Sequence, residues 1–156
     1  MNRNQSIFWF IWLPALMVAG CGRASVPSPS ATTPAPPRLS PVHVEGEGWP
    51  RQAFDSLGRK VTIPAAPKRV VSLAPSNTEI LFAIGAGDLV VGVTMMDDYP
   101  PEVKSRTSIG GMAIGGMNLE TLAALKPDLV LATAGVQQPA VEPLQRLGLT
   151  VVGLDA

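Results

Sequence analysis

Few side chains in this sequence have the types or the spacing of a catalytic or metal-binding site. The chain contains one cysteine, Cys21, and one histidine, His43. A nucleophile needs a nearby base, most often histidine, and zinc sites combine Cys, His and carboxylate ligands. The glycines match neither a phosphate loop nor the dinucleotide-binding fingerprint. We therefore expect no enzyme activity, with no catalytic residue, no cofactor and no metal site.

Four methionines supply the remaining chemistry. Met95 and Met96 lie in one expected loop, and Met112 and Met117 lie in another. Thioethers can bind copper, but they also form a polarizable apolar surface that suits a ligand or simple packing. Because the four are divided between two loops, the sequence favours the apolar surface over the copper site.

The first 21 residues predict a lipid-anchored protein. Arg3 gives a positively charged start, and residues 7–19 form an apolar stretch too short to span a bilayer. Residues 18–21, Val-Ala-Gly-Cys, resemble the lipobox of bacterial lipoproteins, whose cysteine is lipidated. We expect a signal peptide over residues 1–20, a lipidated Cys21 and an extracytoplasmic protein, in the periplasm or on the outer face of the cell membrane. The alternative is an ordinary secretory signal with an incidental cysteine.

Residues 21–48 are expected to form a spacer that carries the anchor. Residues 23–41 are rich in Pro, Ser, Thr and Ala, and this composition cannot bury a core. The twelve basic and twelve acidic residues of the whole chain are scattered, and no run of like charge is longer than two residues. Because no basic run appears, we do not expect nucleic acid as a partner.

The stretch over residues 67–87 organises the folded part. Residues 69–73 are a β-branched run after a proline, which is typical of a buried strand. Ser76 and Glu79 have the spacing of a capping box, so we expect a helix to begin there. Gly85 should end this helix. Its expected apolar stripe consists of Ile80, Leu81 and Ile84.

The same pattern repeats along the chain. A β-hairpin is expected over residues 53–63, with Gly58 in its turn, and Asn118 should cap a helix. Further strands are expected at residues 89–94, 128–132 and 150–154, and further helices at residues 119–126 and 139–147. The last of these helices should have Ala140, Leu144 and Leu147 inward, with Pro143 inside it.

Three strand–helix–strand crossovers in succession predict an α/β fold. We expect a Rossmann-like open parallel sheet of about four strands flanked by helices. In such sheets, ligands bind beyond the carboxyl ends of the strands. This rule places a candidate ligand site at Pro75 and Ser76, directly after the first strand.

Four motifs occur in a characteristic order at residues 68–79, 98–101, 116–120 and 125–130. They read Lys-Arg-Val-Val-Ser-Leu-Ala-Pro-Ser-Asn-Thr-Glu, Asp-Tyr-Pro-Pro, Gly-Met-Asn-Leu-Glu and Leu-Lys-Pro-Asp-Leu-Val. Together they resemble the helical-backbone class (class III) of ABC-transporter substrate-binding proteins, which serve cobalamin, ferric siderophores and haem. The second and third motifs are most similar to the cobalamin-binding member. The resemblance implies two lobes joined by a long helix, and residues 49–156 match the N-terminal lobe, without the C-terminal lobe.

The resemblance also implies a ligand surface. Met96, Met112 and Thr133 fall where the cobalamin binder presents aromatic side chains, with Ile114 as the alternative to Met112. Tyr99 either points into the cleft or packs beneath the two prolines that follow it. Glu120 matches the acidic knob that pairs with arginines of the permease in this family. A helix-end glutamate that complements the helix dipole is the alternative for Glu120.

The function implied by the resemblance is capture of cobalamin or a related metal chelate outside the membrane and its delivery to the transmembrane subunits of an ABC permease. One alternative is a ferric-siderophore or haem receptor of the same family. Another is a one-lobed surface lipoprotein that serves as an interaction module. A surface-anchored hydrolase or nucleotide-dependent enzyme is the remaining class, but neither Ser76 nor Gly135 lies in the motif that such chemistry requires.

Overall fold

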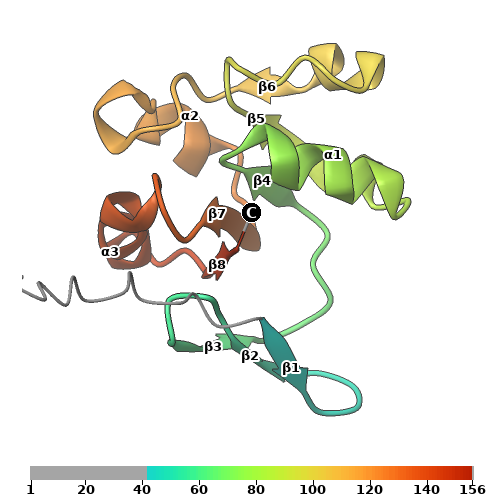
Figure 1. Ribbon diagram of the computed structural model, residues 1–156, viewed down its shortest axis with the longest axis vertical. Coiled ribbons are helices and arrows are strands. Elements are labelled where there is room, and N and C mark those ends of the chain that lie inside the picture. Colours follow the sequence, from blue (N-terminus) through green and yellow to red (C-terminus); the bar gives the residue numbers. More distant parts are fainter. Residues whose placement is uncertain (1–41, 156) are drawn as a thin grey trace, which may run out of the picture. The chain divides into compact units, whose positions relative to one another are not determined.

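The computed structural model describes residues 42–155, which form two β-sheets and three α-helices (Figure 1). The predicted signal peptide, Cys21 and residues 21–41 of the predicted spacer lie outside these described residues. None of the helices in the described part of the chain is long and apolar enough to cross a membrane.

The larger sheet has five parallel strands in the order β6-β5-β4-β7-β8. In the central strand β4, Val70 pairs with Val90 of β5 on one side and with Leu129 of β7 on the other. The strands are β4 (Val70–Ser72), β5 (Val90–Val93), β6 (Thr107–Ser108), β7 (Leu129–Thr133) and β8 (Val151–Leu154). The α/β class and the parallel sheet are confirmed, and the expected strand count was one short. The missed strand, β6, has only two polar residues and carries no apolar run.

Helices cover both faces of this sheet (Figure 1). One face carries α2 (Leu119–Ala124) and α3 (Gln138–Arg146), which bury Leu122 and Leu144 against Val130 and Val151. The opposite face carries α1 (Pro75–Ala83), which buries Leu81 against Val90. Burial of such side chains away from water is the main force that holds the three layers together. Three short 3-10 helices complete the connections: η1 (Gly87–Leu89), η2 (Pro101–Ser105) and η3 (Ile114–Gly116).

A small antiparallel sheet precedes the parallel one. Its strands are β1 (His43–Glu45), β2 (Arg51–Phe54) and β3 (Lys60–Ile63). The predicted hairpin is confirmed, and Gly58 has the positive φ of +73° that its turn requires. Strand β1 lies within residues 21–48, so the predicted spacer does not reach residue 48. All three residues of β1 are exposed, and β1 pairs only with β2 at the edge of the small sheet, so its sequence carries little apolar signal.

The start of α1 differs from the prediction. No side chain caps this helix; Ala74 is its N-cap residue and Pro75 occupies the first helical turn, where its fixed φ is favourable. The prediction of a capping box formed by Ser76 and Glu79 is therefore wrong. Ile80 and Ile84 are also mostly exposed, at 56% and 70%, so Leu81 is the buried member of the expected stripe.

The later helices agree better with the sequence. Asn118 caps α2, since its side-chain oxygen accepts a hydrogen bond from the Thr121 amide at 2.9 Å. α3 contains Pro143 and ends before Gly148, which has a φ of +79°. Ala140 and Leu144 are buried as expected, whereas Leu147 is 52% exposed because it follows the last helical residue.

Candidate functional site

The loop between β4 and α1 forms one wall of the candidate site. Its turn is fixed by the Ser72 hydroxyl, which donates a hydrogen bond to the Ala74 carbonyl oxygen at 2.9 Å. The Thr78 hydroxyl donates to the same oxygen at 3.3 Å. Ala74 is buried, Pro75 is half-buried and Ser76 is exposed. Because Ser76 is not used as a helix cap, its hydroxyl is available to a ligand.

The loop after β7 forms the facing wall. The buried side chain of Gln137 fixes it, since Oε1 of Gln137 accepts hydrogen bonds from the Thr133 amide at 2.7 Å and from the Thr133 hydroxyl. The Ala134 amide also donates to the Leu154 carbonyl at 2.7 Å, which ties this loop to the end of β8. The Thr133 hydroxyl is therefore engaged within the protein.

A glycine-rich loop, residues 110–116, brings Met112 to the same end of the sheet. The Gly111 amide donates to the Gly116 carbonyl at 2.7 Å, and the Asn118 amide donates to the Ile109 carbonyl at 2.7 Å. Gly110 has a φ of +90°, and a Cβ there would lie 2.6 Å from the Gly116 carbonyl oxygen. Glycine is thus required at Gly110 for the loop to fold back on itself.

These loops surround a depression of about 330 Å³ at the carboxyl ends of β4 and β7, called here the strand-end depression. It brings together Pro75, Ser76, Met112 and Thr133, four of the residues predicted to bind ligand. The lining residues that the sequence reasoning missed are Ala134, Gly135, Val136 and Asp155. Their position after predicted strands was the signal that could have found them, because such loops meet at one edge of a parallel sheet.

The strand-end depression is lined mainly by apolar groups, which could contact the apolar surface of a ligand. Met112 and Val136 give a thioether and a branched alkyl group, Ser76 adds a hydroxyl, and Asp155 is the charged residue among those that line it. In the described part of the chain, no group of three or more His, Cys, Asp or Glu residues is placed to hold a metal ion.

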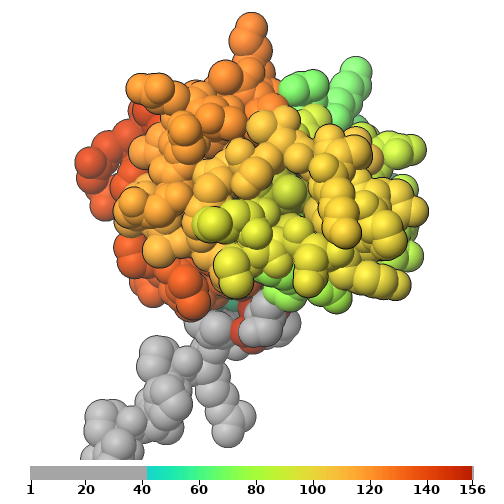
Figure 2. Space-filling model, turned by 90° about the horizontal axis from the view of Figure 1, so that it is seen from above, coloured from blue at the N-terminus to red at the C-terminus, as the bar shows by residue number. Residues whose placement is uncertain are grey.

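Met96 lies in the loop after β5 and does not line the strand-end depression. This loop is held by Asp97, whose carboxylate accepts hydrogen bonds from the Thr94 amide at 2.9 Å and the Thr94 hydroxyl at 2.5 Å. The Met95 amide also donates to the Gly110 carbonyl at 2.8 Å, so the loop after β5 lies beside the glycine-rich loop. Figure 2 shows this face, where the yellow and orange segments adjoin. Met96 is 60% exposed there.

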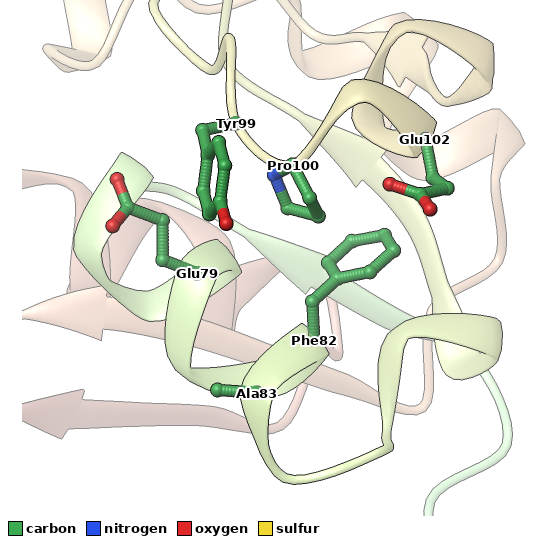
Figure 3. A pocket seen from close by; sticks show the side chains of 6 residues that line it. All are labelled: Glu79, Phe82, Ala83, Tyr99, Pro100 and Glu102. Atoms are coloured by element: carbon green, nitrogen blue, oxygen red, sulfur yellow. The ribbon is translucent and has the colours of Figure 1, made fainter.

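Tyr99 lies in a different place. It lines a second depression, of about 300 Å³, between α1 and η2, together with Pro100 and Phe82 (Figure 3). The ring is not beneath the prolines, because Tyr99 is 63% exposed. The structure therefore does not bring Tyr99 to the strand-end depression.

Glu120 lies in the first turn of α2, where its carboxylate is exposed. This position is compatible with both sequence interpretations, because a carboxylate in the first helical turn complements the helix dipole and an exposed one can also contact a partner. α2, which carries Glu120, covers the face of the sheet opposite α1, the helix that lines the Tyr99 depression (Figure 1).

Comparisons with known proteins identify related sequences. The sequence profile of a family described as periplasmic binding protein matches residues 70–155. YvrC of Bacillus subtilis, an uncharacterized ABC transporter substrate-binding lipoprotein, is 39% identical over 158 aligned positions, which cover 99% of this chain and 46% of YvrC. A vitamin B12-binding protein of Pectobacterium carotovorum is 43% identical over 93 residues, which cover 59% of this chain and 33% of that protein.

A solved structure agrees with these sequence matches. The periplasmic vitamin B12-binding protein BtuF of Vibrio cholerae superposes with a TM-score of 0.50 and 36% identity, over 56% of this chain and 34% of BtuF. The chain therefore spans less than half the length of each of these three relatives.

Proposed function

This chain belongs to the periplasmic binding protein family, and on that premise we propose that it is the extracytoplasmic substrate-binding component of an ABC importer. The observation that carries the proposal is the strand-end depression, which gathers Pro75, Ser76, Met112 and Thr133 at the carboxyl ends of parallel strands. The relatives it matches are binding and transport proteins, not enzymes. A non-catalytic role in solute capture follows from the same premise.

The proposed ligand is cobalamin or a related metal chelate. Two of the relatives are vitamin B12-binding proteins, and the mixed apolar and hydroxyl lining of the strand-end depression can pack against a large planar ring. A depression of about 330 Å³ lies at the lower end of small-molecule sites. The residues described here therefore supply one wall of the contact with such a ligand.

A direct titration tests the proposed ligand class. The full chain is titrated with cobalamin, cobinamide, haem and a ferric hydroxamate, and binding is followed by equilibrium dialysis and by amide chemical shifts. We expect cobalamin or cobinamide to bind and to perturb the amides of residues 74–76, 112 and 133–136. Preferred binding of haem or the hydroxamate would support the alternative receptor function. Binding of none would contradict the proposal and favour the one-lobed interaction lipoprotein.

The proposed location is outside the cytoplasmic membrane, with a lipid anchor on Cys21. The extracytoplasmic location follows from the family, and the anchor is supported by the lipobox-like residues 18–21. YvrC, which aligns over 99% of this chain, is described as a lipoprotein.

The proposed partner is the transmembrane part of an ABC permease, contacted through Glu120. Reversing this charge by Glu120→Lys should weaken binding to the permease at least about tenfold, because like charges then face each other across the contact. The measurement is capture of the permease in lipid nanodiscs, with cobalamin affinity measured in parallel. Glu47→Lys, which reverses another exposed charge, is the control and should have no effect. Loss of cobalamin binding in Glu120→Lys would instead assign Glu120 to the ligand site.

A further inference from the structure

The depression that contains Tyr99 has the chemistry of a cation site. Phe82, Tyr99 and Pro100 form apolar walls, and the carboxylates of Glu79 and Glu102 stand on either side of them (Figure 3). The volume is about 300 Å³. Aromatic faces attract cations, and carboxylates accept the hydrogen bonds of ammonium and guanidinium groups. This acidic-aromatic depression is separate from the strand-end depression.

The charge around this depression is unbalanced, although the whole chain is neutral. Residues 79–106 contain five acidic and two basic residues, a net charge of −3, against twelve of each sign in the full sequence. Glu79 and Glu102 belong to none of the ion pairs between described residues. The nearby Arg106 borders this depression and already has partners: its guanidinium lies 5.8 Å from the centre of the Phe82 ring, donates to the Gly87 carbonyl at 3.1 Å and approaches Asp88 at 3.8 Å. The ring of Tyr99 and the carboxylates of Glu79 and Glu102 are therefore the groups left for an added cation.

The openness of the site determines what kind of occupant it can hold. Glu79, Tyr99 and Glu102 are all exposed, and an exposed cation–π contact or open ion pair changes a Kd by only about two- to fivefold. A free small cation therefore gains little here. A cationic side chain on a protein surface gains more, because the neighbouring exposed Ile80 and Ile84 of α1 offer apolar contacts at the same time.

We propose that the outer surface of α1, with the acidic-aromatic depression beside it, docks a protein partner that inserts an arginine. A guanidinium group is planar, so it can stack on Tyr99 while its N–H groups reach the two carboxylates. The docking surface includes α1, which covers the face of the sheet opposite α2, and it shares no residue with the lining of the strand-end depression. The inference thus goes beyond the proposed transport function and is independent of it.

Peptide probes test this docking surface directly. An N-acetylated Leu-Arg-Leu amide is titrated into the full chain at low salt, and amide chemical shifts are recorded. The matched probe replaces arginine by citrulline, which has the same shape without the charge. We expect the arginine peptide to shift the amides of Glu79, Phe82, Tyr99 and Glu102, and the citrulline peptide to bind at least about fivefold more weakly.

Variants of the chain complete the experiment. Glu79→Gln combined with Glu102→Gln should raise the Kd for the arginine peptide about tenfold, whereas Glu47→Gln, a matched change elsewhere, should leave it unchanged. Equal binding of the two peptides, or an unchanged Kd in the double variant, would overturn the proposal. Tighter binding of free agmatine than of the arginine peptide would also overturn it, since the site would then belong to a small molecule.

Discussion

The carboxylate of Asp55 joins the small sheet to the edge of the large one. The residue is 1% exposed. Its Oδ1 accepts hydrogen bonds from the amides of Leu57 at 3.1 Å and Arg59 at 2.9 Å. Its Oδ2 accepts from the Gly153 amide in β8 at 3.1 Å and from the Arg59 guanidinium. Burial by itself would raise the pKa of Asp55, but the hydrogen bonds and the charge of Arg59 together hold it below its ordinary value.

This arrangement predicts an acid-dependent loss of stability. A carboxylate with a lowered pKa in the folded state stabilises the protein above its unfolded pKa, and that contribution is lost as the pH falls through the lower folded pKa. Asp55→Asn should therefore lower the free energy of unfolding at pH 7 by about 1–3 kcal/mol. The difference from the unmodified chain should shrink below about pH 4. Urea unfolding followed by circular dichroism between pH 7 and pH 2.5 measures both.

Asp98→Asn provides the control for Asp55→Asn. Asp98→Asn makes the same chemical change at an exposed residue, where the hydrogen bonds that Asp55 makes to β8 are not involved. We expect its unfolding curve to follow that of the unmodified chain at every pH. A constant gap between Asp55→Asn and the unmodified chain down to pH 2.5 would show that the Asp55 charge is not what stabilises this junction.

At the scale of elements, apolar runs predicted the sheet well because their signal is local. β4, β5, β7 and β8 are all short runs rich in Val and Leu, and each was placed within one or two residues. β6 was missed because Thr107 and Ser108 form a strand only through pairing with β5. The start of α1 was misplaced because Ser76 and Glu79 match a capping box, whereas Pro75 in fact begins the helix.

The sequence predicted the part of the candidate site that follows from the order and direction of the strands. Pro75, Ser76, Met112 and Thr133 come together because the loops at the carboxyl ends of parallel strands share one edge. Tyr99 does not join them, because the direction of a side chain within a long loop depends on contacts that spacing does not reveal. The buried Gln137 that holds Thr133 was missed for the same reason, since no sequence pattern marks a glutamine as buried.

At the scale of the whole molecule, the proposed lipid anchor at Cys21 would determine where the folded part can act. Twenty residues, 22–41, lie between Cys21 and Val42, the first described residue. If the segment is extended like polyproline, it reaches roughly 60 Å. A lipid anchor at Cys21 would thus keep the strand-end depression within reach of a membrane-embedded permease, at a high local concentration.

Lipidation of Cys21 can be tested by metabolic labelling. A chain processed at the lipobox should incorporate an alkyne-tagged fatty acid and partition into the detergent phase, because two acyl chains at about 0.8 kcal/mol per buried methylene give stable membrane attachment. Cys21→Ala removes the only thiol of the sequence and should abolish the label completely. Ser25→Ala, four residues further on, leaves the lipobox intact and should be labelled like the unmodified chain. Label retained in Cys21→Ala, or absent from the unmodified chain, would contradict lipidation at Cys21. Residues 1–21 would then act as an ordinary secretory signal, and the folded part would not be held near a permease by a lipid anchor.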